Sequence, residues 1–415
     1  MTDLATLTRV FGRIGLLSFG GPAAQIALMH RVLVGERGWL TETQFLRALS
    51  FCMLLPGPEA MQLATWAGWR MRGLAGGLIA GTLFVLPGAV LITALALAYV
   101  EWGTRPEAGA LMLGVKAAVI AIVIEAVIRV SRKALKGPRD RLIAVLAFAG
   151  LFAFALPFPL VIALAALWGA LSARGAAPAT VPPPEASRMP RLTVPVLAGL
   201  WLAPLPILWA MGQTFLFDIA AFFAKLAVVT FGGAYAVLAW MAQEVVQARG
   251  WLDAGQMVDA LGLAETTPGP LILVTQFVGM LAGHAQGGAA LALAAGALTL
   301  WMTFLPCFLW IFAFAPHLDR LLARPRLQAA LAGVTAAVVG VIANLSLWFA
   351  IHVVFAETRL VEAGPLALTL PLPGSLQPLS LPLIAVAVLL LLVFKRGIPV
   401  TLAACAALGL ALGAL

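Results

Sequence analysis

The sequence is poor in charged residues. Only 10% of its 415 residues are Asp, Glu, Lys or Arg, while 62% are hydrophobic and the mean hydropathy is +1.03. An ordinary soluble domain carries roughly 25% charged residues, so this balance excludes a water-soluble fold. At about 20 apolar residues per crossing, the hydrophobic content is enough for a dozen or so membrane helices. We therefore expect an all-α polytopic membrane protein.

Cysteine and histidine are also scarce. The three cysteines and four histidines are scattered without ligand spacing, which indicates neither a disulfide framework nor a zinc site. The sequence has no G-x-x-x-x-G-K-[ST] loop and no nucleophile and base at a recognisable spacing, so neither ATP-driven transport nor an enzyme is supported. We expect no cofactor and no metal. The N-terminal residues lack a clean apolar core and a cleavage site, so we expect no removable signal peptide.

Thirteen apolar runs are candidate crossings, and several are too short or too interrupted to be straight helices. They are 9–30, 45–69, 74–100, 110–129, 142–156, 160–174, 193–211, 218–240, 257–283, 288–315, 327–355, 379–394 and 398–415.

The excess of basic residues predicts an orientation. The chain has 26 Lys and Arg against 17 Asp and Glu. With a cytoplasmic N-terminus, 18 basic residues fall in inside loops, 4 outside and 4 within crossings. Cytoplasmic loops retain Lys and Arg, so this split favours a multi-pass protein with a cytoplasmic N-terminus. The basic run at 129–141 could also bind nucleic acid or anionic lipid, but we interpret it as topology and expect no nucleic-acid partner.

An internal repeat divides the chain. Residues 11–58 align without a gap on residues 223–270, with 18 identities in 48 positions. A proline-rich stretch suggests a cytoplasmic linker between the copies. We expect an N-terminal repeat at 1–174, the linker at 175–192, a connecting segment at 193–217 and a C-terminal repeat at 218–415. Six crossings on either side of one connecting segment place the copies in opposite orientations, which is typical of secondary transporters.

Glycine and proline motifs recur at equivalent positions of the two copies. Glycine permits unusual backbone angles and proline removes a donor, so we expect broken or re-entrant helices whose N-termini bind an anion. Close helix packing by the glycines and simple proline kinks are the alternative. The motifs are Phe19, Gly20, Gly21 with Phe231, Gly232, Gly233, and Pro56, Gly57, Pro58 with Pro268, Gly269, Pro270.

Polar residues near these motifs are candidate substrate ligands. The hydroxyl groups are those of Ser18, Thr230, Thr266 and Thr267, and the amides are those of Gln62 and Gln276. Their alternative role is hydrogen bonding between helices. Arg13 and Lys225 supply positive charge if they point inward, or extend to the interface if they do not.

Two acidic residues flank the Pro-Gly-Pro motifs and are candidate proton carriers. Glu59 follows the first motif and Glu265 precedes the second. Ionisable groups within membrane segments are costly and tend to be functional. Glu125 and Asp259 are weaker candidates, because Glu125 could pair with Arg129 and Asp259 could lie at the interface.

The motifs resemble the chromate ion transporter family in its long two-domain form. The resemblance covers most of the chain, and the residues that carry it are Ser18–Pro22, Arg37–Leu40, Leu55–Glu59 with Gln62, Leu86–Gly88, Thr230–Leu238, and Glu265–Ile272 with Gln276–Gly279. It implies a bacterial inner-membrane protein that exports chromate, confers resistance and is driven by the proton gradient or membrane potential. It also implies that the Phe-Gly-Gly and Pro-Gly-Pro regions contribute to function.

The expected partners are a tetrahedral dianion, protons and the lipid bilayer. Chromate and sulfate share charge and shape, so the residues do not separate them, and a sulfate or other oxyanion transporter remains an alternative. A passive anion channel is a further alternative. Oligomeric state is not readable from the sequence, and a homodimer is left open.

Overall fold

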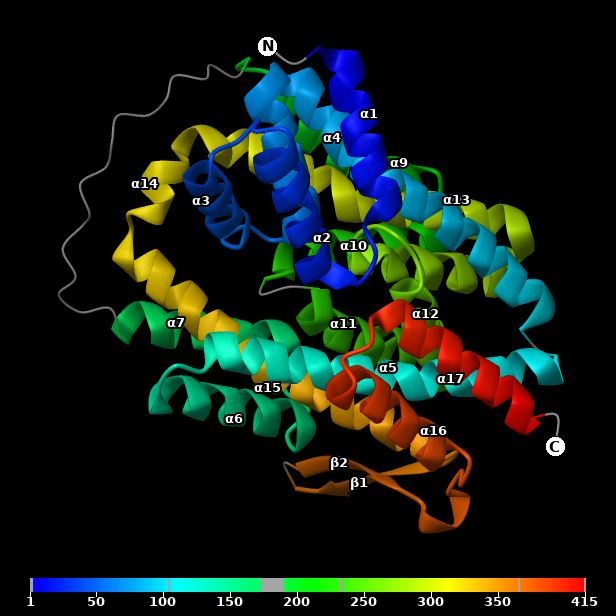
Figure 1. Ribbon diagram of the computed structural model, residues 1–415. Helices are drawn as coiled ribbons and strands as arrows, with labels where there is room; N and C mark the ends of the chain where they lie inside the picture. Colours follow the sequence, from blue (N-terminus) through cyan, green and yellow to red (C-terminus); the bar gives the residue numbers. More distant parts are fainter. Residues whose placement is uncertain (1–2, 104, 173–189, 232–233, 365, 414–415) are drawn as a thin grey trace. The chain divides into compact units, whose positions relative to one another are not determined.

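The computed structural model describes residues 3–103, 105–172, 190–231, 234–364 and 366–413 (Figure 1). Contacts divide the chain into two compact units, and each unit is assembled from segments of both halves of the sequence. The first comprises 1–97, 176–234 and 267–327, and the second comprises 98–175, 235–266 and 328–415. Most of the expected linker at 175–192 lies outside the described residues.

The first unit is entirely helical where it is described. Its elements are α1 (Leu4–Leu17), α2 (Gly21–His30), the π-helical turn η1 (Arg31–Glu36), α3 (Glu42–Cys52), α4 (Glu59–Trp102, of which the last turn belongs to the second unit), α8 (Thr193–Leu202), α9 (Pro204–Ala210), α10 (Thr214–Val229), the 3₁₀ turn η3 (Leu271–Leu273), α13 (Val274–Phe314), the 3₁₀ turn η4 (Ala315–His317) and α14 (Leu318–Leu322).

The second unit contains the remaining helices and one small sheet. Its elements are α5 (Pro106–Ala134), α6 (Pro138–Phe152), α7 (Phe158–Ser172), α11 (Ala234–Ala242), the π-helical turn η2 (Gln243–Ala248), α12 (Ala254–Glu265), α15 (Pro325–Val354, whose first residues belong to the first unit), β1 (Thr358–Ala363), β2 (Leu366–Pro371), the 3₁₀ turn η5 (Pro373–Ser375), α16 (Ser380–Val388), the π-helical turn η6 (Leu389–Val393) and α17 (Ile398–Gly413).

Five helical segments of the described chain are long and apolar enough to cross a membrane. They are Glu59–Trp102, Pro106–Ala134, Thr193–Ala210, Leu271–His317 and Pro325–Val354, and three shorter apolar helices accompany them. The predicted helical membrane protein is therefore confirmed, whereas the count of thirteen crossings remains a prediction.

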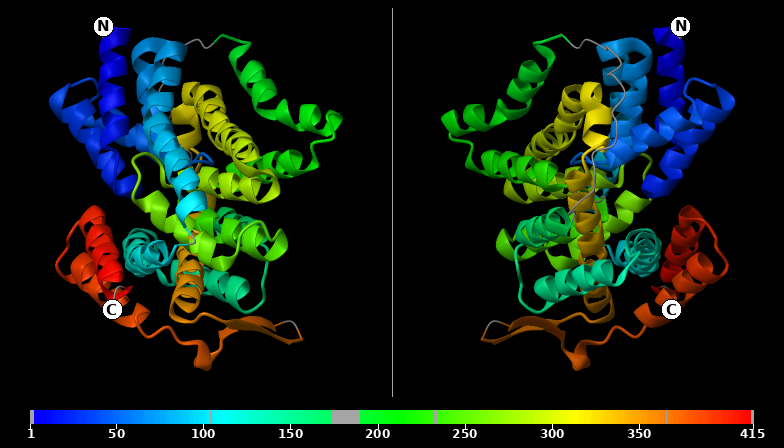
Figure 2. Two further views of the ribbon diagram at one scale, coloured as in Figure 1. Left: turned by 90° about the vertical axis from the view of Figure 1, so that its right-hand side faces the viewer. Right: turned by 90° about the vertical axis from the view of Figure 1, so that its left-hand side faces the viewer.

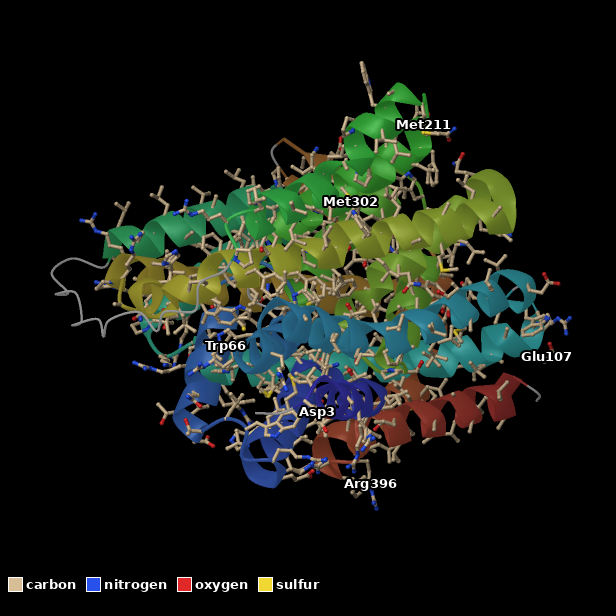
Figure 3. The ribbon with its side chains drawn as sticks, turned by 90° about the horizontal axis from the view of Figure 1, so that it is seen from above. Asp3, Trp66, Glu107, Met211, Met302 and Arg396 are labelled. Carbon is tan, nitrogen blue, oxygen red and sulfur yellow. The ribbon has the colours of Figure 1, made fainter. Side chains whose placement is uncertain are left out.

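The two longest helices, α4 and α13, each fold back on themselves. The backbone leaves helical geometry at Arg72 and Gly73 in α4 and at Gly287 and Gly288 in α13. Small residues line the contact between the two arms of each helix, because a side chain at Gly81 would collide with Thr65 and one at Gly283 with Ala295. Small residues at such contacts allow membrane helices to approach closely. The same helix α13 passes α8 near Met302, whose carbonyl accepts a bond from Trp201 Nε1 at 3.0 Å (Figure 3).

The N-terminal helices also form a folded-back pair. Arg13 on α1 and Arg31 in η1 line the same small cavity, although a straight helix would separate them by about 27 Å at 1.5 Å per residue. The reversal lies at Gly20 and Gly21, which have φ of +88° and +75°. The range 9–30 is thus not one straight crossing, and its hydropathy alone did not distinguish the two cases.

Helices of the two halves exchange partners within the second unit. The long helix α5 of the first half packs against α16 and α17 of the second half, and these three elements lie side by side in both views of Figure 2. Conversely, α6 and α7 of the first half pack against α15: an added side chain at Gly340 would collide with Ala144, and one at Gly169 with Ala329.

One small two-stranded sheet accompanies the predicted helices. Strands β1 and β2 pair antiparallel, from Thr358 opposite Pro371 to Ala363 opposite Leu366. The backbone N–H of Ala367 also donates to Ala153 O at 2.9 Å. This stretch lies between two apolar helices, where we expected only a connection. Its mixed polar and apolar residues follow no helical period, and the pairing satisfies their backbone groups.

Candidate functional site

The helix break after α1 is built from a serine and two glycines. Ser18 is 1% exposed, and its hydroxyl donates to Ile14 O at 2.5 Å, which satisfies a carbonyl in the last turn of α1. Gly20 then adopts a left-handed conformation that most side chains disfavour. Thr230 ends α10 in the same way, with a donation to Leu226 O at 2.5 Å. The breaks therefore fall where the motifs predict them.

The two Pro-Gly-Pro segments exchange equivalent backbone hydrogen bonds with these breaks. Gly57 N donates to Thr230 O at 2.8 Å, and Gly269 N donates to Ser18 O at 2.9 Å. Both donors and both acceptors are separated by 212 residues, the displacement that superimposes the sequence on itself. All four residues lie in the first unit. Each copy thus supplies the donor for the helix break of the other copy.

The long helices α4 and α13 also contact the Pro-Gly-Pro segment of the opposite copy. An added Cβ at Gly57 would lie 2.9 Å from Cys307 Sγ of α13, and one at Gly88 of α4 would collide with the Pro268 carbonyl. Gly88 follows Pro87, and Cys307 follows Pro306. A proline-containing turn of each long helix therefore supports the Pro-Gly-Pro segment of the opposite copy.

Three buried glutamines stabilise these irregular segments. Gln62 Nε2 donates to Pro56 O at 2.7 Å, and Gln276 Nε2 donates to Thr93 Oγ1 at 2.7 Å and Ala89 O at 3.1 Å. Gln25 was not predicted; its Nε2 donates to Gly269 O at 2.5 Å and Ser18 O at 3.3 Å. Its position on α2 next to the glycine motif was the only signal in the sequence. In this conformation the amide nitrogens are occupied, and the buried carbonyl oxygens have no hydrogen-bond partner among the described residues.

Backbone N–H groups at the start of α2 are the remaining donors at the break. Ser18 and Thr230 use their single hydroxyl protons on their own helices, and Thr266 donates to Leu263 O at 2.7 Å. Among the described residues, no side chain caps α2, which has Pro22 in its first turn. A helix N-terminus without a capping side chain favours an anion through its N–H groups and its partial positive charge.

The two predicted cations lie on exposed faces of their helices. Both Arg13 on α1 and Lys225 on α10 are solvent-accessible in the described chain. Arg13 lines a cavity of about 30 Å³ together with Arg31, Glu36 and Arg37. The cavity contains more positive than negative charge, because Glu36 is its single acid and pairs loosely with Arg31 at 3.7 Å.

Of the two predicted proton carriers, Glu265 is the more deeply buried. It ends α12, is 6% exposed and accepts a hydrogen bond from Tyr235 Oη at 2.8 Å. Glu265 and Tyr235 both belong to the second unit. Glu59 starts α4 directly after Pro58 and is partly exposed. Thr267, between Glu265 and the motif, is 4% exposed.

Asp259 forms an ion pair that the sequence did not reveal. It is 5% exposed, lies 3.2 Å from Lys116 Nζ of α5 and accepts a bond from Tyr99 Oη at 2.8 Å. Asp259 is thus buried within the protein. Glu125 pairs with Arg129 at 2.7 Å, as its spacing indicated.

Some predicted site residues are not placed by this geometry. Gly232 and Gly233 lie outside the described residues. Phe19 is exposed and Phe231 partly exposed at the two breaks. Within the described ranges, no group of three or more His, Cys, Asp or Glu could hold a metal ion, and the three cysteines are free and buried.

The described chain is a helical membrane protein with paired helix breaks, the kind of architecture found in transport proteins. Comparison with known families agrees: the chromate transporter family profile matches residues 5–170 and 217–410. The chain belongs to the chromate transporter family. It is accordingly a transport protein and not an enzyme. The two matched stretches begin 212 residues apart, the same displacement as the internal repeat.

Three relatives illustrate the similarity. The chromate transport protein of Pseudomonas aeruginosa is 35% identical over 80% of this chain and 77% of its own length. The chromate transport protein of Cupriavidus metallidurans is 31% identical over 82% of this chain and 80% of its own. The uncharacterized transporter YwrB of Bacillus subtilis is 29% identical, but it covers 40% of this chain with 85% of its own length. No solved structure matches the fold.

Proposed function

We propose that the protein is a secondary active transporter that exports chromate from the cytoplasm across the bacterial inner membrane, coupled to protons or to the membrane potential. Its family and the names of two relatives that each match at least 80% of this chain support chromate as cargo. The observation that carries the proposal is the reciprocal pair of bonds from Gly57 to Thr230 and from Gly269 to Ser18. Irregular backbone at membrane depth is tolerated where it is buried in protein or lines a cavity for substrate.

The substrate site is formed in this proposal by the helix breaks of both copies. A tetrahedral dianion accepts bonds from the free N–H groups at the start of α2, and Arg13 and Lys225 add positive field. Ser18 and Thr230 contribute once their hydroxyls rotate away from Ile14 and Leu226. The other motif residues shape the site through their backbones. Gln62 and Gln276 act by holding those backbones in place.

The two copies alternate access to this site. Reciprocal bonds between equivalent residues support an approximate two-fold relation, and the single apolar segment Thr193–Ala210 between them would invert the second copy. We place the N-terminus in the cytoplasm on the basis of the basic-residue distribution. Rocking of one copy against the other would open the site to each side in turn.

Proton coupling is assigned to Glu265, with Glu59 as the second candidate. A carboxylate in an environment as buried as that of Glu265 is costly to keep charged unless it is paired. Tyr235 is its neutral hydrogen-bond partner. Binding of a proton there, in exchange for release of the dianion, would couple the two movements.

Flux in proteoliposomes tests this function. Radiolabelled chromate uptake is measured with an imposed pH gradient, with an imposed membrane potential, and with excess sulfate. We expect uptake that responds to at least one gradient and resists sulfate competition. Ohmic current with uptake indifferent to both gradients would replace the transporter with a passive channel. Equal competition by sulfate would widen the substrate class to tetrahedral oxyanions.

The Glu265→Gln substitution tests the coupling residue. It removes the titratable proton but keeps the size of the side chain and an acceptor for Tyr235, so we expect folded protein with pH-driven uptake reduced at least about tenfold, a loss of roughly 1.4 kcal/mol of coupling. Glu107→Gln, an exposed acid in the first turn of α5, is the matched control. Unchanged pH-driven uptake in the Glu265 variant would remove this residue from the mechanism.

A further inference from the structure

A groove between α6 and α7 is lined entirely by apolar and aromatic residues. Its volume is about 350 Å³, and Ala337 of α15 closes its base. Leu142 and Leu146 of α6 and Leu164 and Trp168 of α7 line it, and all four side chains are about half exposed. The two helices and α15 lie next to one another in Figure 1.

The packing of the second unit leaves this groove open. Gly340 of α15 is in contact with α6, and Gly333 of α15 is in contact with the Ala165 carbonyl of α7. These small residues draw one face of each helix onto α15. The leucines on the opposite faces project outward and do not fill the space between the helices. A space of this shape takes a flexible apolar chain.

Basic residues cluster at one end of the groove. Five exposed cations lie at the end of α5 and the start of α6: Arg132, Lys133, Lys136, Arg139 and Arg141. The acid within the cluster, Asp140, accepts bonds from the backbone N–H groups of Lys136 and Gly137 at 3.0 Å and so caps α6. Among the described residues, none of the five cations forms an ion pair within 4.0 Å. The cluster therefore offers charge that the protein does not neutralise.

The cluster and the groove are adjacent. Arg139 and Arg141 lie in the first turn of α6, directly before the groove residues Leu142 and Ile143. The groove then extends along α7 up to Leu171, near the end of that helix. With 15 residues, α6 is about 22 Å long, shorter than a hydrocarbon layer of about 30 Å. Thinning of the bilayer around such a short helix brings phosphate groups to the level of the flanking cations.

We propose that this groove is a binding site for an anionic phospholipid, with one acyl chain between α6 and α7 and the phosphate against Lys136, Arg139 and Arg141. The apolar lining matches the chain, and the unneutralised cations match the head group. A second copy of the protein would fill the apolar part but would need acidic residues opposite the cluster. Exposed acids of this chain are sparse, since it has 17 Asp and Glu against 26 Lys and Arg.

Quenching of Trp168 tests the site directly. The full-length protein is reconstituted into vesicles of phosphatidylcholine that contain a small fraction of brominated phosphatidylglycerol or of brominated phosphatidylcholine. Bromine on the acyl chain quenches nearby tryptophans, and the Trp168→Phe variant isolates the contribution of this residue. We expect the Trp168 contribution to be quenched at far lower mole fractions of the anionic lipid than of the zwitterionic lipid.

Paired variants separate the contribution of the cations to lipid binding from the contribution of the apolar lining. Arg139→Gln with Arg141→Gln removes two contacts, each worth about a factor of five, so selectivity for the anionic lipid falls roughly twenty-five-fold. Lys395→Gln with Arg396→Gln, exposed cations between η6 and α17, is the control. Leu146→Phe adds bulk in the groove without adding a tryptophan and is expected to reduce quenching of Trp168, whereas Val145→Phe, exposed but outside the lining, is expected to leave it unchanged.

Each alternative result contradicts the proposal in its own way. Equal quenching of Trp168 by both brominated lipids would indicate bulk bilayer at the groove without a specific site. Absence of quenching by either lipid, together with crosslinking between two copies through cysteines placed at position 146, would indicate that a second copy covers the groove. Selectivity that survives the Arg139 and Arg141 changes would place the anionic contact elsewhere.

Discussion

Gly57 has little room for a side chain and an unfavourable backbone for one. Its φ is +121°, and an added Cβ would lie 2.8 Å from Gln62 Nε2 and 2.9 Å from Cys307 Sγ. Gly288 also has a positive φ, but nothing lies within 4 Å of an added Cβ. Comparing substitutions at these two glycines therefore separates the cost of backbone strain from the cost of steric crowding.

We expect Gly57→Ala to destabilise the protein more than Gly288→Ala. Backbone strain of about 1–3 kcal/mol acts at both sites, and crowding acts only at Gly57. The measurement is the thermal midpoint of purified protein in detergent. Equal midpoints for the two variants would contradict the close packing at the Pro-Gly-Pro segment.

The Lys116–Asp259 pair gives a second prediction. Removal of one partner of a buried ion pair leaves an uncompensated charge and typically costs about 3 kcal/mol or more, whereas replacing both partners by apolar groups is often neutral. We expect Asp259→Asn to lower the thermal midpoint and Lys116→Met with Asp259→Leu to recover most of the loss. If the double variant is less stable than the single one, the pair is required for more than charge balance.

These residues also show what the sequence could predict. The breaks at Gly20 and Gly57 follow from their chemistry, since glycine permits unusual backbone angles and the neighbouring prolines remove a donor. The partners of Gln25 and Asp259 could not be predicted, because Gly269 and Lys116 are 244 and 143 residues away in the chain. Local chemistry determines where a helix ends, and only tertiary packing determines what covers the end.

Two helices begin with the same capping arrangement at equivalent positions. Thr41 and Gln44 cap α3 reciprocally, and Asp253 and Gln256 cap α12. Each cap satisfies backbone N–H groups at a helix start. The positions differ by 212 residues, so the repeat extends to the local geometry of its helix starts.

Loss of either cap has a predictable cost. We expect Thr41→Ala to destabilise α3 by about 1 kcal/mol, whereas Thr41→Ser keeps the hydroxyl and most of the stability. Hydrogen–deuterium exchange across α3 measures the change, because amides of the first turn lose protection when the cap is lost. Identical protection in the alanine and serine variants would show that tertiary packing, and not the cap, fixes the start of α3.

At the scale of elements, hydropathy predicted helices but not their paths. Apolar content near 9–30 is the same for a straight crossing and for the folded-back pair α1 and α2, and the left-handed glycines decide between them. The β1–β2 hairpin was not predicted because its pairing partners define each other only once the chain folds. The breaks, by contrast, were predicted from glycine and proline alone.

Opposite orientation of the two copies is testable on the intact protein. Glu36 and Ala248 are exposed, and they occupy equivalent positions at the ends of the π-helical turns η1 and η2. We expect a membrane-impermeant maleimide to label Glu36→Cys and Ala248→Cys from opposite sides of the membrane. The three native cysteines are buried, so the unsubstituted protein provides the background. Labelling of both positions from one side would show parallel copies.

The interlocked hydrogen bonds also constrain how the chain is made. When the ribosome has released Gly57, the Thr230 carbonyl that pairs with it does not yet exist, and Gly269 comes later still. The first half of the chain is therefore inserted into the bilayer before the Gly57 N–H group can pair with the Thr230 carbonyl. A chain with a single copy of the repeat would lack this hydrogen-bond partner unless a second polypeptide supplied it.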